Sequence, residues 1–65
     1  MELEEIYKLL DEQVELIKDT SDFYQANQWL TGFVSCLFRL NTFTDETHLK
    51  AILDYKSKIL WENFD

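Results

Sequence analysis

The feature that most constrains this chain is its lack of residues that interrupt helices: there is no proline, and Gly32 is the one glycine among 65 residues. Sheet proteins need turn residues at frequent intervals, and these are mainly Gly, Pro and Asn. We therefore predict an all-α protein, a single domain over residues 1–65. Helices over about 2–19, 22–41 and 45–63 should form a small three-helix bundle with short connecting turns and antiparallel neighbours.

The first predicted helix has the apolar spacing of a helix that packs against others. At 100° per residue, its main apolar side chains fall within an arc of about 100°. These residues are Leu3, Ile6, Tyr7, Leu10, Val14 and Ile17. Leu9 and Leu16 lie outside this arc, and acidic residues occupy the opposite side.

The second predicted helix is apolar over about 200° of its circumference, which favours a central element packed on two neighbours. Trp29 is expected to anchor the core, and Cys36 to behave as a small buried hydrophobe. Gly32 and Cys36 are small residues four positions apart, a spacing that permits close approach of another backbone.

Two helix starts and one misplaced charge stand out at the level of single residues. Asp22 followed by Gln25 resembles a capping box, and Thr44 is the predicted N-cap of the third helix. The third helix has one apolar face, formed by Leu49, Ile52, Leu53, Ile59, Leu60 and Phe64. Lys56 falls within that face, where it either extends along its stem to water, pairs with an acid, or signals an error in the helical register.

The sequence carries little that suggests catalysis. Cys36 and His48 are the sole cysteine and histidine, and a Cys–His pair supports nucleophilic chemistry only if the fold brings the two together. Phosphate loops, catalytic triads and zinc-ligand spacings are absent from the sequence. We expect no enzyme activity, no cofactor and no metal.

The sequence also bears on location. One cysteine makes no internal disulfide, and the acidic start does not resemble a signal peptide, so a cytoplasmic protein is expected. The longest uncharged stretch, between Asp22 and Arg39, is too short and too rich in amides for a membrane span.

Charge narrows the class of partner. Thirteen acidic and six basic residues give a net charge of −7, which disfavours direct binding to nucleic acid or to an anionic membrane. Five acids share one face of the first helix: Glu4, Glu5, Asp11, Glu12 and Glu15. This face is either a solvated surface that keeps the protein soluble, or a mimic of phosphates that occupies a basic groove.

Several apolar and uncharged residues fit poorly into a single small core. Five apolar residues lie outside the packing arcs: Leu9, Leu16, Tyr24, Phe43 and Trp61. They either form an interface or pack at the periphery. The polar face of the second helix lacks acids and is either ordinary surface or a docking face: Gln28, Thr31, Ser35 and Arg39. Because so short a chain is marginally stable alone, a homodimer is expected.

These features favour a small acidic protein–protein interaction module, a regulator or inhibitor of a larger protein. In size, acidity and helix content the chain is similar to small phage or mobile-element accessory proteins. One alternative is a nucleic-acid mimic that blocks a DNA- or RNA-binding protein through the acidic face. Another is a structural homodimer subunit of a larger assembly.

Overall fold

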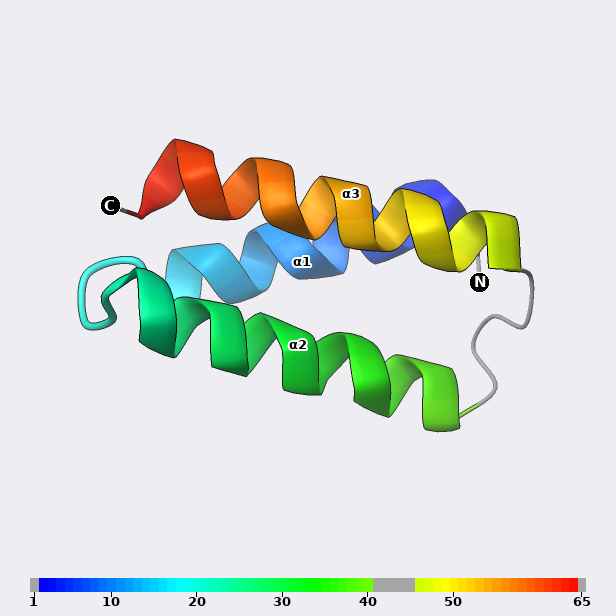
Figure 1. Ribbon diagram of the computed structural model, residues 1–65, viewed down its shortest axis with the longest axis horizontal. Coiled ribbons are helices and arrows are strands. Elements are labelled where there is room, and N and C mark those ends of the chain that lie inside the picture. The colour runs from blue at the N-terminus through cyan, green and yellow to red at the C-terminus, as the bar shows by residue number, and fades with distance from the viewer. Residues whose placement is uncertain (1, 41–45, 65) are drawn as a thin grey trace.

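Three helices account for most of the residues that the structure describes. The computed structural model describes residues 2–40 and 46–64. The helices are α1 (Leu3–Ile17), α2 (Phe23–Arg39) and α3 (Glu46–Asn63). They run up, down and up, so that α1 and α3 are parallel, α2 is antiparallel to both, and the two termini lie at opposite ends (Figure 1). The predicted all-α three-helix bundle is confirmed.

The start of α2 is fixed by local hydrogen bonds. The backbone N–H of Gln25 donates to Asp22 Oδ1 at 2.8 Å, and the backbone N–H of Asp22 donates to Gln25 Oε1 at 3.1 Å. This is the reciprocal pair of a capping box, which satisfies amides that a helix start leaves open. The predicted cap at Asp22 is confirmed, whereas Thr44 lies outside the described residues.

The core occupies the axis between the three helices. Each helix contributes one buried row: in α1 and α2 its members lie three or four residues apart, whereas on α3 they include the adjacent pair Ile59 and Leu60. The buried side chains are Ile6, Leu10, Val14, Ile17, Ala26, Leu30, Val34, Leu37, Ile52, Ile59, Leu60 and Phe64. All of them belong to the apolar arcs predicted from the sequence. Ile6, Leu10, Leu30 and Ile52 are the largest fully buried side chains, so they fix how closely the helices approach.

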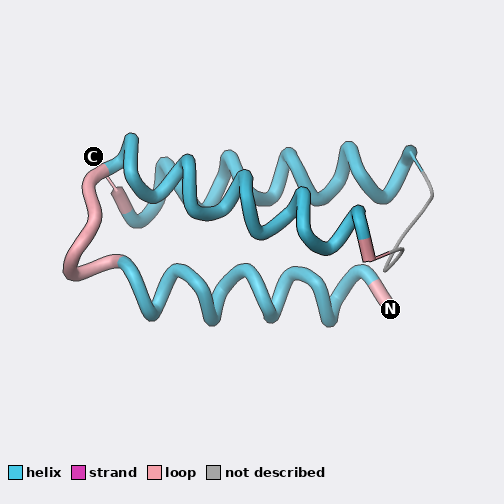
Figure 2. The backbone as a smooth tube through the Cα atoms, turned by 90° about the horizontal axis from the view of Figure 1, so that it is seen from below, coloured by secondary structure: helices cyan, strands magenta, loops and turns pink. Residues whose placement is uncertain are grey.

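The predicted central position of α2 is wrong. Each helix packs on the other two around a common axis, and the most extensive contact is between α1 and α3. Figure 2 shows the same arrangement from below, with the connection between α1 and α2 at one end of the bundle. The part of α2 that α1 and α3 cover is narrower than the apolar arc of α2. Part of that arc therefore faces outward.

Two predictions for single residues of α2 are corrected for the same reason. Trp29, expected to anchor the core, is 53% exposed, and its indole Nε1–H donates to Gln13 Oε1 at 2.9 Å. Cys36, expected to be buried, is exposed. Both lie on the edge of α2 next to α1, outside the arc that the bundle covers.

Candidate protein interface

An apolar groove runs between α2 and α3. Its volume is about 350 Å³ and its lining is Thr31, Val34, Ser35, Phe38, Arg39, Leu49 and Leu53; we call it the α2–α3 groove. Phe38 is 49% exposed and Leu53 is 42% exposed. Both side chains therefore contribute exposed apolar surface at the groove.

Lys56 stands beside this groove and joins α3 to α2. Its ammonium donates to Asn27 Oδ1 at 3.1 Å and to Thr31 Oγ1 at 3.0 Å. Partial burial lowers the pKa of the Lys56 ammonium. No acid among the described residues of the same chain pairs with Lys56, since both of its acceptors are neutral, and pairing with an acid across a subunit boundary stays a prediction.

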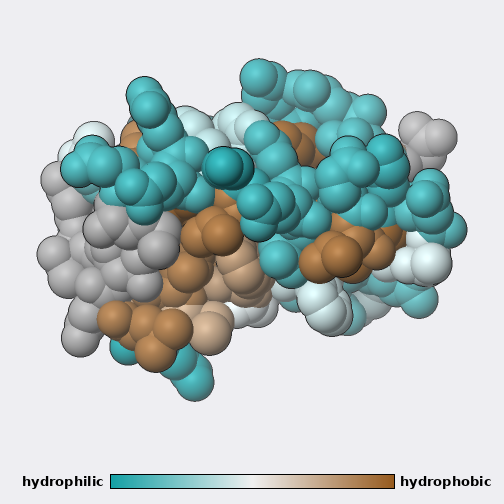
Figure 3. Space-filling model, turned by 180° about the vertical axis from the view of Figure 1, so that it is seen from behind, coloured by the Kyte–Doolittle hydropathy of each residue, from teal (hydrophilic) through white to brown (hydrophobic). Residues whose placement is uncertain are grey.

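A second apolar surface follows the junction of α1 and α2. It consists of Leu9, Leu16, Trp29, Phe33, Cys36 and Leu40, and we call it the α1–α2 band. Leu16 and Leu40 are each 70% exposed, whereas Leu9 and Phe33 are partly buried. Figure 3 views the molecule from this side and shows apolar side chains spread across the face below the charged side chains.

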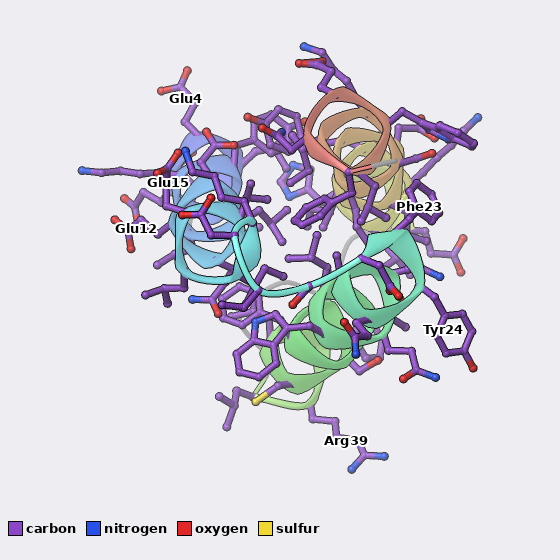
Figure 4. All side chains as sticks on the ribbon, turned by 90° about the vertical axis from the view of Figure 1, so that its left-hand side faces the viewer. Glu4, Glu12, Glu15, Phe23, Tyr24 and Arg39 are labelled. Atoms are coloured by element: carbon purple, nitrogen blue, oxygen red, sulfur yellow. The ribbon has the colours of Figure 1, made fainter. Side chains whose placement is uncertain are left out.

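Two of the remaining apolar candidates, Tyr24 on α2 and Trp61 on α3, lie near the N-terminal end of α2. Trp61 is exposed, as predicted, and its ring packs at a tilt on Phe23 with 4.8 Å between the centroids. Tyr24 is also exposed, and its hydroxyl accepts a hydrogen bond from Gln28 Nε2 at 3.0 Å. Figure 4 shows Tyr24 directed away from the bundle. Phe43 lies outside the described residues.

The polar face of α2, which carries no acid, separates the groove from the band. All four predicted residues are exposed: Gln28, Thr31, Ser35 and Arg39. Gly32 lies among them, and a Cβ atom built there meets no other atom within 4 Å. Among the described residues, therefore, no other backbone makes the close approach that the small residues at Gly32 and Cys36 permit.

The acidic face of α1 is largely free of internal partners. Glu4, Glu12 and Glu15 project away from the bundle (Figure 4). Glu5 is exposed as well, and Lys18 pairs with Glu15 at 3.1 Å. The hypothesis of a nucleic-acid mimic rests on this face and stays a prediction.

Asp11 differs from the other four acids because it is held against α3. The hydroxyl of Tyr55 donates to its two carboxylate oxygens at 2.8 and 3.0 Å. The Tyr55 ring also stacks on Tyr7, with 4.2 Å between centroids and 19° between planes. Burial, followed by the hydrogen bond to Asp11, raises the pKa of Tyr55 to about 12.

Other kinds of site find little support. Within residues 2–40 and 46–64 no cluster of His, Cys, Asp or Glu is placed to hold a metal ion. Cys36 is on the outer edge of α2, whereas His48 is on α3, seven residues before Tyr55 and therefore on the side that faces α1. In the described part of the chain, no helix has both the length and the hydropathy needed to cross a bilayer.

No protein-family model, curated protein or solved structure matches this chain. Functional inference therefore depends on the exposed surfaces themselves. Sequence reasoning identified Leu9, Leu16, Tyr24 and Trp61 as misfits but assigned Phe38, Leu40 and Leu53 to packing arcs. The available signal was the width of the arc of α2, which exceeds what two neighbouring helices cover.

Proposed function

We infer that this protein is a small acidic helical interaction module that regulates or inhibits a larger protein. Binding, and not catalysis, is its role. The contact is made by the α2–α3 groove, which receives an amphipathic helix of the partner. The observation that carries this inference is the joint exposure of Phe38 and Leu53 on either side of the groove.

Geometry supports a helix as the bound element. The groove lies between two antiparallel helices, so a third helix placed along it would make the arrangement of a four-helix bundle. Apolar side chains spaced by three and four residues on the partner would contact Phe38, Leu49 and Leu53. These contacts would supply most of the affinity, since a few central apolar residues usually dominate an interface.

The charges around the groove indicate what else the partner carries. Arg39 lines the groove, and Lys56 donates to Thr31, which also lines it. Within the described residues neither cation has a carboxylate partner. An acidic residue at the edge of the partner's apolar face would therefore find an ammonium or guanidinium without displacing an internal ion pair.

The experiment compares two variants that carry the same change on different surfaces. Leu53→Glu places a carboxylate in the groove, while Leu16→Glu places one in the α1–α2 band; both variants have a net charge one unit more negative. The wild-type protein is used to capture partners from its native cell, and each captured protein is then purified and titrated. A true partner binds the wild type and Leu16→Glu but loses at least about tenfold in affinity for Leu53→Glu.

The opposite pattern contradicts the proposal. If the captured proteins bind Leu53→Glu as tightly as they bind the wild type, the groove is not the contact surface. Circular dichroism of both variants checks that the helices persist, which is expected because both positions are exposed.

A further inference from the structure

We propose that the α1–α2 band is covered by a second copy of this chain, in a two-fold symmetric dimer with antiparallel α2 helices. This inference concerns a different surface from the α2–α3 groove, although Arg39 borders both. The band is apolar, and Leu16, Trp29, Cys36 and Leu40 are exposed within the described residues. A two-fold axis through the band would bring residues of its two ends together.

The placement of the residues along the band fits such an axis. The hydrogen bond from Trp29 to Gln13 shows that these two residues lie at about the same height along the bundle axis. At 1.5 Å per residue, Leu40 then lies about 10.5 Å from Phe33 toward one end, and Leu16 lies about 10.5 Å from it toward the other. A two-fold axis close to Phe33 therefore places each Leu16 on the Leu40 of the second copy. These are the two most exposed aliphatic side chains of the described residues.

Trp29 is matched with Cys36 of the second copy in the same way. Trp29 lies about 6 Å from Phe33, and Cys36 lies about 4.5 Å from it in the opposite direction. The axis therefore sets the indole of one copy near the thiol of the other. Trp29 is half exposed and Cys36 is exposed, so both are available for this contact. Aromatic side chains such as that of Trp29 are enriched at the buried centres of interfaces.

Charge also favours this surface over the others. Two copies at −7 repel each other, and α2 is the helix without a carboxylate from Phe23 to Arg39. Arg39 lies at the α2 edge of the band and Glu12 at the α1 edge (Figure 4). At 1.5 Å per residue, Arg39 lies about 9 Å from Phe33 and Glu12 lies about 4.5 Å from it in the opposite direction. The two-fold axis therefore leaves each Arg39 offset by about 4.5 Å from Glu12 of the second copy along the helix, an offset that the long arginine side chain can span. Neither side chain forms an ion pair within the described residues of its own chain.

The long side of the molecule that carries the band, including its hydrophilic part (Figure 3), is large enough for a standard dimer interface. One long side of a body measuring 31 × 18 × 17 Å is about one fifth of its surface, hence about 900 Å² of the 4631 Å² exposed by the chain, against roughly 800 Å² per partner in a standard interface.

Sedimentation of the wild type, Leu16→Glu and Leu53→Glu over a range of concentrations tests the interface. We expect the wild type to dimerise, Leu16→Glu to raise the dimer dissociation constant by more than about tenfold, and Leu53→Glu to leave it within about twofold. A wild type that stays monomeric up to about 1 mM overturns the proposal. Equal weakening by both variants also overturns it, since the interface would then extend over the outer face of α2. A negative result for the dimer does not bear on partner binding in the α2–α3 groove, because that binding is measured separately, by titrating the captured partner with Leu53→Glu.

A charge exchange tests the two-fold geometry. Arg39→Glu and Glu12→Arg should each weaken the dimer, and the double variant, which has the wild-type net charge, should restore it to within about threefold. A double variant no stronger than the weaker single variant contradicts the assigned axis. Maleimide labelling of Cys36 supplies a second readout: its rate should fall as the wild-type concentration rises, and should stay constant for Leu16→Glu.

Discussion

Replacing Gly32 with alanine should stabilise the protein by about 1 kcal/mol, the difference in helix propensity between the two residues in a helix interior. Glycine loses more backbone freedom on folding than alanine, and the substitution removes that cost from the unfolded state. The usual opposing term is a steric clash. Here that term is absent, because a Cβ atom at Gly32 meets no other atom within 4 Å. For a domain of this size the gain corresponds to a rise in Tm of about 4–8 °C.

Urea denaturation followed by far-ultraviolet circular dichroism measures this effect at concentrations where the wild type is monomeric. Ser35→Ala is the matched control, since Ser35 is exposed one turn further along the same face of α2. Its expected gain is smaller, about 0.5 kcal/mol. If Ser35→Ala stabilises the protein while Gly32→Ala does not, position 32 is not an open position in a regular helix. The reasoning from propensity and free space would then be refuted.

Three further predictions concern polar contacts. Asp22→Ala should lower the free energy of unfolding by about 1 kcal/mol through loss of the α2 cap, whereas Asp22→Asn, which keeps an acceptor oxygen, should cost less than half as much in the same urea titration. Tyr55→Phe should cost about 1 kcal/mol below pH 10, moderated by the surface position of the bond to Asp11. Because the pKa of Tyr55 is raised to about 12, the unfolded chain loses this proton first, so stability curves of wild type and variant should converge between about pH 10 and 12. Lys56→Met should raise stability by no more than about 0.5 kcal/mol at neutral pH, because the burial that lowers the pKa of Lys56 is partial, so water screens much of its cost, and because the variant loses the hydrogen bonds to Asn27 and Thr31. That gain should shrink as alkaline pH removes the charge from the wild type, and a gain independent of pH would show that desolvation is not its cause.

Much of the fold follows from local features of the sequence. The scarcity of helix breakers, the apolar spacing of each segment and the capping pair at Asp22 and Gln25 place three helices, and each observed helix begins and ends within two residues of its predicted limits. These features are local because a helix satisfies its own backbone hydrogen bonds, and because its apolar arc shows which side is buried. The misfit of Leu16 and Trp61 was visible for the same reason.

The spacing of residues within each helix could not predict the contacts between helices. The bond from Tyr55 to Asp11 and the bonds from Lys56 to Asn27 and Thr31 each join residues more than twenty positions apart. They depend on the rotation of one helix against another, which no single helical wheel contains. Sequence reasoning accordingly grouped Asp11 with the free acids and left the surroundings of Lys56 open.

The sequence by itself determined that this chain forms three helices and which stripe of each is apolar enough to be buried. Tertiary structure decided how much of each stripe the bundle covers. Three helices around one axis shield only the inner part of each circumference, so the wide apolar arc of α2 was left with two exposed edges, at Trp29 and at Phe38. Burial depends on the neighbours that surround a side chain, and those neighbours are set by packing over the whole molecule.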